Sequence, residues 1–322
     1  MILLTGAAGF IGSALTAYLN EQGLTDLVLV DDFSNPAKRP NWLHKRYRYL
    51  LERHQLWDWL NAYARDLTAI FHIGARTDTF LQDETTFQEL NLTYSQKLWT
   101  IATEYQIPFF YASSAATYGN GEHGFSDDEK LLPVLRPLNP YARSKHQFDL
   151  WVVSQAYTPP RWAGFKFFNV YGPNEYHKGP MSSVAYRGTL QILQENELRL
   201  FRSYRPDYKD GEQKRDFVYV KDVVQVLYFF LTQEAPSGIY NLGTGRAESF
   251  LTLAEALFRA MGRPPRIRFI DMPEPIREKY QYFTEADIRK LRSAGYTKPF
   301  QPLSEEVEAY VREYLWPIRR YW

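Results

Sequence analysis

Short apolar runs alternate with longer amphipathic stretches through the first half of the chain. Five runs have the length and composition of buried strands: Ile2–Thr5, Leu27–Val30, Ala69–Ile73, Phe109–Ser113 and Gly164–Phe168. Four stretches between them carry apolar residues at helical spacing: Phe10–Gln22, Leu56–Ala64, Thr85–Tyr105 and Pro140–Gln155. Strands that alternate with helices predict βαβ units, so we expect an α/β protein with a Rossmann-type, doubly wound parallel sheet.

The pattern changes after about residue 169. Further strands are predicted at Leu198–Phe201, Phe217–Val220, Ile239–Asn241 and Ile267–Phe269. Further helices are predicted at Met181–Gln194, Val223–Leu231, Phe250–Met261 and Glu285–Ser293. The polar stretch Ser203–Lys214 predicts a surface loop. We expect residues 1–168, with roughly 215–245, to form the Rossmann domain, and residues 169–214 and 246–322 to form a smaller, interleaved α/β lobe that binds substrate.

Composition narrows the class of protein. The 322 residues carry a net charge of +1, which provides no field for nucleic acid or for an acidic membrane surface. The absence of cysteine excludes disulfides and thiolate chemistry. Met1 leads directly into an apolar strand without a basic segment, and no apolar run approaches the ~20 residues of a membrane span. We therefore expect a cytoplasmic protein.

A glycine-rich segment follows the first predicted strand. Gly6, Gly9 and Gly12 have the spacing that allows a tight turn, close approach of a pyrophosphate and close packing of the next helix. The free N–H groups at that helix start suit phosphate. Asp31 and Asp32 close the next strand, where an acidic residue binds a ribose hydroxyl. This context predicts dinucleotide binding.

The choice between NAD and NADP stays open from these residues alone. Asp31 favours NAD, because its carboxylate accepts hydrogen bonds from a 2′-hydroxyl. Lys38 and Arg39 follow closely and suit a 2′-phosphate instead.

A tyrosine and a lysine share one face of a predicted helix. Asn139 can cap this helix and Pro140 suits its first turn, so Tyr141 and Lys145 lie one turn apart. A nearby ammonium is expected to lower the pKa of the Tyr141 phenol, which could then take a proton from a sugar hydroxyl. Ser114, at the end of a strand, could share that proton.

Several motifs resemble those of the extended short-chain dehydrogenase/reductase superfamily. They are Thr5–Gly12, Ser114–Gly119, Tyr141 with Lys145, Phe168–Pro173, Arg215–Val220 and Tyr240–Gly243. Three further segments are similar to the ADP-glycero-manno-heptose 6-epimerases: Asn169–Ala185, Asn241–Phe250 and Tyr280–Asp287. The similarity extends from Met1 to about Tyr310, and the His177–Gly179 segment is its most specific part.

This resemblance implies an NADP-dependent homo-oligomeric epimerase that acts on ADP-D-glycero-D-manno-heptose, a lipopolysaccharide-core precursor. It implies that Tyr141 and Lys178 are the two acid/base groups and that Lys145 binds the cofactor. Lys38 matches a basic residue near the 2′-phosphate, which favours NADP over NAD. Which of the two acid/base groups acts in oxidation and which in reduction stays open.

The residues and the resemblance together give a wider set of candidates. For the cofactor they are Gly6, Gly9, Phe10, Ile11, Gly12, Asp31, Asp32, Lys38, Gly74, Ala75, Asn91, Lys145, Val170 and Lys178. For the substrate they are Ser114, Asn169, Pro180, Arg187, Phe201, Arg215 and Tyr280. We expect no metal site, because the histidines lack ligand spacing.

Some segments depart from the family pattern. Ile73 and Arg76 stand where an acidic and a small residue are expected, and Arg202–Lys214 is longer than usual. Asn35–Arg53 and Gly121–Arg136 match weakly.

Two alternatives remain. One is another enzyme of the superfamily, such as a UDP-hexose 4-epimerase or a nucleotide-sugar dehydratase. A dehydratase would want an acidic pair after Ser114, where the chain has Ala115 and Ala116. The other is a non-catalytic NADP-binding protein, which would have no need of Ser114, Tyr141 and Lys145.

Overall fold

A seven-stranded parallel sheet forms the centre of the protein. Its strands are β1 (Ile2–Thr5), β2 (Leu27–Asp31), β3 (Tyr49–Glu52), β4 (Ala69–His72), β5 (Phe109–Ser114), β6 (Trp162–Phe167) and β11 (Gly238–Leu242). They lie in the order β11-β6-β5-β4-β1-β2-β3 in the computed structural model, which describes residues 1–79, 81–277 and 280–322. The predicted α/β class with a doubly wound parallel sheet is confirmed.

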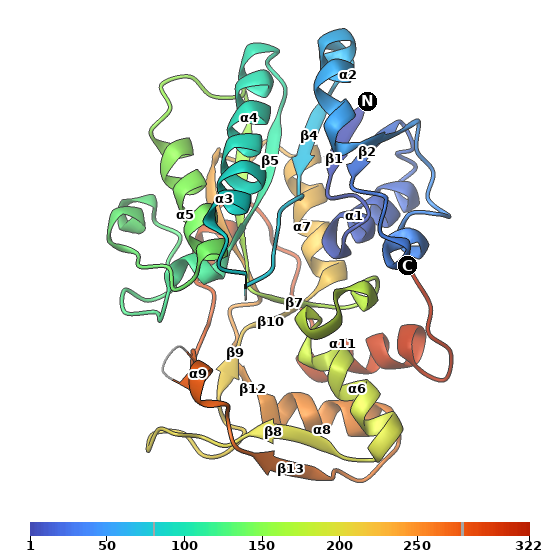
Figure 1. Ribbon diagram of the computed structural model, residues 1–322, viewed down its shortest axis with the longest axis vertical. Coiled ribbons are helices and arrows are strands. Elements are labelled where there is room, and N and C mark those ends of the chain that lie inside the picture. Colours follow the sequence, from blue (N-terminus) through green and yellow to red (C-terminus); the bar gives the residue numbers. More distant parts are fainter. Residues whose placement is uncertain (80, 278–279) are drawn as a thin grey trace.

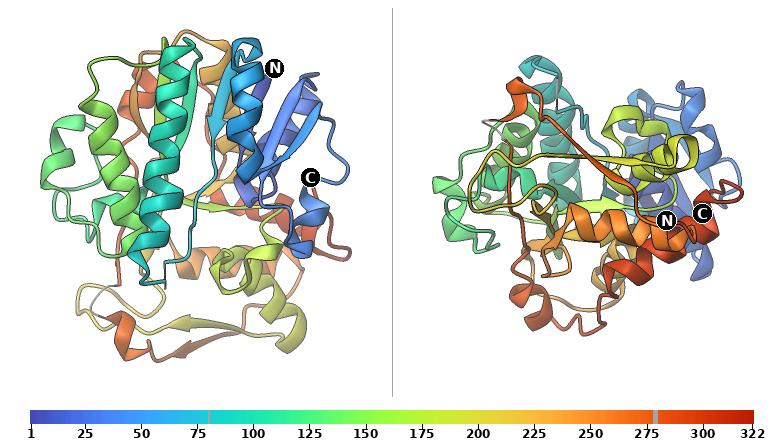
Figure 2. Two further views of the ribbon diagram at one scale, coloured as in Figure 1. Left: turned by 45° about the horizontal axis from the view of Figure 1, so that its top comes forward. Right: turned by 90° about the horizontal axis from the view of Figure 1, so that it is seen from below.

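Helices cover both faces of this sheet (Figures 1 and 2). Those on one face are α1 (Phe10–Glu21) and α7 (Val220–Thr232), and those on the other are α2 (Leu56–Tyr63), α4 (Tyr94–Glu104) and α5 (Pro140–Val153). Each face of the sheet has its own hydrophobic core. Alternate residues of β1 enter the two: Ile2 and Leu4 pack into the core under α1 and α7, and Leu3 packs into the core under α2, α4 and α5. Strands buried on both faces explain why their sequences read as continuous apolar runs.

The strand order reverses between β1 and β4. The chain winds outward from β1 through β2 to β3, then crosses back to β4 and winds the other way. The loops that leave two adjacent strands therefore part at this point and open a crevice at their carboxyl ends.

A smaller lobe lies beyond those carboxyl ends (Figure 1). Its strands pair as β8 (Leu198–Phe201) with β13 (Ile267–Ile270), and β9 (Lys214–Arg215) with β12 (Glu248–Ser249). Its helices are α6 (Val184–Glu195), α8 (Phe250–Ala260) and α11 (Leu303–Tyr310). A third pair, β7 (Asn169–Tyr171) with β10 (Phe217–Tyr219), lies between lobe and sheet. The residue boundaries expected for the two parts stay a prediction.

Several elements differ from the sequence prediction. The helix expected over Thr85–Tyr105 is α3 (Glu84–Phe87), a π-helical turn (Gln88–Thr93) and α4. The helix expected from Met181 begins at Val184, because the Ser183 side chain caps it by accepting from the Tyr186 N–H. The strand β3 was missed because it is a short, half-buried edge strand without alternation.

The helix expected over Glu285–Ser293 was too long. Only α10 (Arg289–Ser293) is helical, because the Ala286 N–H donates to the Asp216 carboxylate at 3.0 Å and the Asp287 N–H to the Phe125 carbonyl. The short helix α9 (Glu274–Arg277) was not predicted. The stretch Ser203–Lys214 is irregular as expected, up to the start of β9. In the described part of the chain, no helix has the length and apolarity to cross a membrane.

We predict that Gly164→Ala lowers the free energy of unfolding by about 1–3 kcal/mol, the usual cost of overpacking a core. A Cβ at Gly164 on β6 would lie 2.3 Å from the ring of Tyr111, which is fully buried. Urea unfolding measures the change. Tyr111→Leu should make room for the methyl, so the double variant should lose less than the sum of the single losses. A loss below about 0.5 kcal/mol for Gly164→Ala would contradict the packing argument.

Candidate active site

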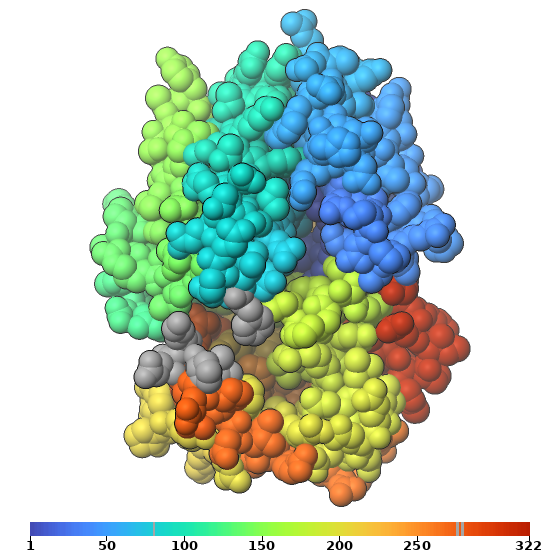
Figure 3. Space-filling view, viewed as in Figure 1, coloured from blue at the N-terminus to red at the C-terminus, as the bar shows by residue number. Residues whose placement is uncertain are grey.

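The larger of two adjoining cavities, here called the Gly-loop cavity, lies at the carboxyl ends of β1, β2 and β4. It has a volume of about 660 Å³ and is lined by the N-terminal segment, residues 72–78 and His177, Lys178 and Met181, among others. Figure 3 shows a recess between the blue, cyan and yellow-green parts of the surface. The predicted cofactor residues that line it are Gly6, Gly9, Phe10, Ile11, Gly12, Asp31, Asp32, Lys38, Gly74, Ala75 and Lys178. This volume is in the usual range for a small-molecule site.

The glycine-rich loop approaches the neighbouring backbone too closely for side chains. Gly6 has a φ of +71°, and a Cβ there would lie 2.6 Å from the Cα of Gly74. A Cβ at Gly12 would lie 2.1 Å from the Gly6 carbonyl oxygen. Helix α1 starts at Phe10 without a side-chain cap, so its first N–H groups face the cavity. A bare loop with uncapped N–H groups fits the pyrophosphate of a dinucleotide.

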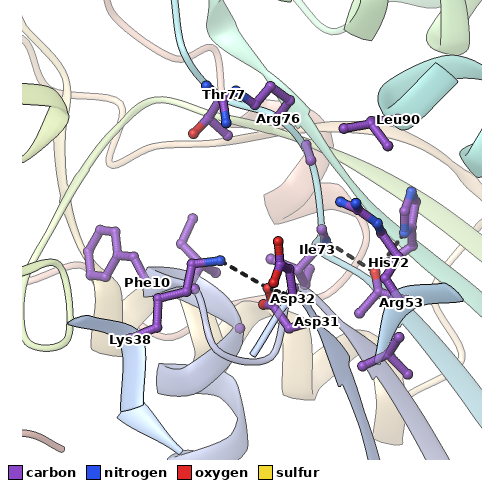
Figure 4. Close-up of a pocket in the computed structure, with 18 of the residues that line it drawn as sticks. Phe10, Asp31, Asp32, Lys38, Arg53, His72, Ile73, Arg76, Thr77 and Leu90 are labelled. Atoms are coloured by element: carbon purple, nitrogen blue, oxygen red, sulfur yellow. Dashed lines mark hydrogen bonds and ion pairs between the residues drawn. The ribbon is translucent and has the colours of Figure 1, made fainter. Parts of the chain in front are cut away.

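Charged groups of both signs meet at the end of β2. Asp31 accepts from the Lys38 ammonium at 3.0 Å and from the Ala8 N–H at 2.9 Å. Lys38 and Arg53 lie on either side of Asp31 and Asp32 (Figure 4), and all four residues line the Gly-loop cavity. The Asp31 carboxylate is thus partly satisfied within the protein, while two cations face the same space.

Asn91 lies behind the loop that follows β4. Its buried side chain accepts from the Arg76 N–H at 2.8 Å and donates to the Arg76 carbonyl at 3.0 Å and to the Ser144 hydroxyl at 2.9 Å. The loop that it holds includes Ala75, which lines both cavities. Asn91, which lies in the π-helical turn, therefore fixes the cavity wall through three hydrogen bonds to Arg76 and Ser144.

The second cavity, here called the Tyr141 cavity, has a volume of about 370 Å³ and adjoins the first. The two share lining residues, among them Phe10, Ile73 and Lys178. The structure brings all four predicted catalytic side chains to it: Ser114, Tyr141, Lys145 and Lys178. They come from the end of β5, from helix α5 and from the turn before α6.

Burial sets the protonation of the groups on α5. Lys145 is 2% exposed and donates to the Ala112 carbonyl at 2.9 Å. Desolvation lowers the pKa of Lys145 to about 8, against the opposing effect of Asp149. The expected lowering of the Tyr141 pKa was wrong: desolvation raises it, a hydrogen bond with Ser114 opposes the rise, and Asp149 adds to it. Tyr141 is therefore a phenol at neutral pH in this structure.

Lys178 lies in a 3-10 turn, Tyr176–Met181, between the two cavities. Its ammonium lies 5.3 Å from the centre of the Phe10 ring. Burial lowers the pKa of Lys178, and the charge of Glu175 opposes this effect. Glu175 is fully buried and accepts from the Gly172 N–H at 3.1 Å and from the Ser183 hydroxyl at 2.8 Å. Sequence reasoning missed Glu175, which holds the turn that carries Lys178.

The candidate substrate residues fall into three groups. Asn169 and Arg187 line the Tyr141 cavity with Ser114, as does Val170, a cofactor candidate. Arg215 lies behind the Phe250 end of that cavity, with its guanidinium 5.5 Å from the Phe250 ring and 5.1 Å from the Tyr280 ring.

The third group is Phe201 and Pro180, which line neither cavity. Phe201 contacts Tyr280 edge to face at 6.2 Å. Pro180 is exposed and lines neither cavity, so the structure does not bring it to the others.

Arg53 is a cavity residue that sequence reasoning missed. It follows β3, the edge strand beside β2, so its side chain reaches the same sheet edge as Asp31. A basic residue directly after a recognised strand would have been the signal. Among the described residues, no group of three or more His, Cys, Asp or Glu side chains has a geometry that could hold a metal ion.

Comparison with known proteins identifies the class. The family described as "NAD dependent epimerase/dehydratase family" matches residues 2–243, which is most of the chain. The chain therefore belongs to this family, and it is an epimerase-type enzyme that uses a nicotinamide cofactor. The superfamily resemblance seen in the sequence is confirmed.

Individual proteins that are similar to this chain have a more specific name than the family. Over 98% of each chain it is 44% identical to the ADP-L-glycero-D-manno-heptose-6-epimerase of Fusobacterium nucleatum subsp. nucleatum, and 48% identical to that of Nitratidesulfovibrio vulgaris strain DP4. The crystal structure of the Helicobacter pylori ADP-L-glycero-D-manno-heptose-6-epimerase is similar with a TM-score of 0.84 and 26% identity, over 98% of this chain and 96% of that one.

We predict that Gly12→Ala weakens binding of the nicotinamide dinucleotide at least ~10-fold, because the added methyl displaces the Gly6 carbonyl from the loop. Fluorescence titration with the reduced dinucleotide measures the affinity. Gly23→Ala is the control: its φ of +81° makes the substitution strain the backbone without a steric clash and outside the cavity, so it should cost stability but not affinity. Equal affinities for the two variants would show that the close approach does not shape the site.

Proposed function

We propose that the protein inverts C6 of the heptose in ADP-D-glycero-D-manno-heptose and so forms the L-glycero epimer. The observation that carries this proposal is that Tyr141 and Lys178, from separate elements, line one cavity beside Ser114. Two relatives that match nearly the whole chain have this activity in their names, which supports the same substrate here.

The chemistry requires two proton-transfer groups. The C6 hydrogen has no adjacent carbonyl, so it is not acidic, and inversion needs transient oxidation to a 6-ketone. A nicotinamide dinucleotide held in the Gly-loop cavity would supply the hydride acceptor and donor. The ketone must present its opposite face before reduction, so the hydroxyl oxygen lies in two positions during one turnover. One group at each position meets this need, with Ser114 as hydrogen-bond partner of Tyr141.

We infer the two roles from the pKa directions of two groups that line the same cavity. Because burial lowers the pKa of Lys178, its neutral amine is accessible and can take the C6 hydroxyl proton during oxidation. Because burial raises the pKa of Tyr141, its phenol keeps a proton that it can give to the oxygen during reduction. Proton exchange with solvent then returns a proton to Tyr141 and removes one from Lys178 before the next turnover. Asn169 also lines the Tyr141 cavity, where its side-chain amide would bind a sugar hydroxyl.

We assign the diphosphate and base to the far end of the Tyr141 cavity. Arg187 lines that cavity, and Arg215 is a buried guanidinium flanked by the Phe250 and Tyr280 rings. Burial lowers the pKa of Arg215, and no carboxylate of the described residues forms an ion pair with it to offset that cost. A diphosphate would compensate that charge, and its oxygens suit the bidentate guanidinium fork.

We propose NADP as the cofactor, with NAD possible. Lys38, which is paired with Asp31, and Arg53 place two cations in the same cavity, where they would offset the charge of a 2′-phosphate. The cytoplasmic location and the homo-oligomeric state remain predictions from the sequence.

We predict that Lys38→Ala and Arg53→Ala each weaken NADP binding ~10–100-fold and change NAD binding little, because only the 2′-phosphate needs the added positive charge. Titrations with both cofactors at two salt concentrations measure the effect. Arg65→Ala, which changes an exposed residue of a 3-10 turn outside the cavity, is the control. Equal losses for both cofactors would contradict the preference for NADP.

We predict that the purified protein converts ADP-D-glycero-D-manno-heptose to the L-glycero epimer without added cofactor, followed by NMR. Tyr141→Phe and Lys178→Met should each lower kcat at least ~100-fold and keep dinucleotide affinity within about threefold, since each removes one proton-transfer group.

Persistence of one epimer after addition of NADP and NAD would contradict the substrate assignment. A UDP-hexose 4-epimerase would instead turn over UDP-sugars and tolerate Lys178→Met. A non-catalytic dinucleotide-binding protein would show no turnover that depends on Tyr141.

A further inference from the structure

A charged pair is buried beneath the catalytic residues and has no part in the proton transfers. Lys166 on β6 and Asp149 on α5 are 1% and 0% exposed at their side chains, and their Nζ and Oδ2 atoms lie 2.6 Å apart. Buried charges are costly, and an apolar pair of similar volume often stabilises a protein as well or better. Stability alone therefore does not explain this pair.

Its hydrogen bonds lead to the end of β5. The Asp149 carboxylate accepts from the Ser113 hydroxyl at 2.7 Å and from the Tyr111 hydroxyl at 3.0 Å. Lys166 donates to the Thr117 hydroxyl oxygen at 2.6 Å, and that hydroxyl donates to the Ser114 carbonyl at 2.8 Å. The pair thus holds the backbone on both sides of the Ser114 side chain.

The same pair also fixes α5. Tyr141, Lys145 and Asp149 follow at four-residue intervals, so they form one stripe of the helix. Lys145 is bonded to the carbonyl of Ala112 on β5, one turn before Asp149 is bonded to Ser113. Two successive turns of α5 are therefore tied to successive residues of the strand that ends in Ser114.

We propose that the Asp149–Lys166 pair is the positioning element that holds Ser114, Tyr141 and Lys145 in register at the Tyr141 cavity. This inference rests on the proposed function, because it assigns these three side chains to proton transfer and cofactor binding. Asp149 and Lys166 touch neither cavity, so they are positioning and not catalytic residues.

Asp149 also changes the electrostatic environment of Tyr141 and Lys145. Asp149 raises the pKa of Tyr141 and of Lys145, in addition to the larger effects of burial. The other titratable groups that face the pair are Tyr111 on β5, Tyr118 after β5 and His146 on α5. Burial raises the pKa of both tyrosines and lowers that of His146, so these three groups are neutral at neutral pH.

The test compares Asp149→Asn, Lys166→Met and the double variant. Each single change leaves one buried group unpaired and is expected to lower the Tm, whereas the double variant removes both charges and should recover most of that loss. We expect the double variant to keep KM and the cofactor Kd within about threefold and to lose kcat at least ~30-fold. Recovery of kcat together with the Tm would overturn the proposal, since the role would then be structural.

The pH profile supplies a readout that a structural role would not move. With Asp149→Asn, the pKa of both Tyr141 and Lys145 should fall, so the alkaline limb of kcat should move to lower pH. An unmoved limb would overturn the proposal. Lys166→Arg, which keeps the positive charge, should retain a larger fraction of the parent kcat than Lys166→Met. The control is Lys290→Met, which breaks an ion pair with Glu129 outside both cavities and should leave kcat unchanged.

Failure of the proposed function can be told apart from failure of this inference. If the parent protein forms no epimer, the substrate assignment fails, and the Tyr141 phenol is titrated directly instead. The absorbance at 295 nm of each protein minus that of its Tyr141→Phe counterpart isolates this one tyrosine. A lower midpoint in the Asp149→Asn background supports the positioning role, and an unchanged midpoint rejects it.

Discussion

The close contact between the chain leaving β1 and the chain leaving β4 is the constraint on which the site depends. Gly6 and Gly74 meet with no room for a Cβ between them, at the place where the strand order reverses. Because the two backbones touch, the N-terminus of α1 is left open to the Gly-loop cavity. The end of β5, next to β4, then places Ser114 beside the same crevice.

The ionisable side chains of the site are also buried, and burial sets the direction of their pKa shifts. Desolvation lowers the pKa of Lys145 and Lys178 and raises that of Tyr141, so each group moves toward its neutral form. An enzyme that must both take and give a proton within one turnover benefits from groups whose neutral forms are accessible. The carboxylates of Asp149 and Glu175 oppose these effects at the two lysines, and both are themselves held by donors from the protein.

The sequence predicted the parts that local patterns encode. Strands buried on both faces gave apolar runs, and the helices between them gave helical spacing, so the class of fold followed. The strand β3 and the pair β9–β12 were missed, since a half-buried edge strand and two-residue strands carry too few residues to show a period. The helix expected over Glu285–Ser293 was too long because Asp216, distant in sequence, binds the Ala286 N–H, which is then not available for a helical hydrogen bond.

By itself the sequence determined the glycine loop, the Tyr141–Lys145 spacing and the motifs that resemble a family, because each is a local arrangement of a few residues. Only the tertiary structure placed Lys178 against Phe10, brought Arg53 beside Asp31, and buried the Asp149–Lys166 pair under Ser114. It also reversed the expected direction of the Tyr141 pKa shift. The physical reason is the same in each case: desolvation and charge proximity depend on which distant segments meet, and no local pattern records that.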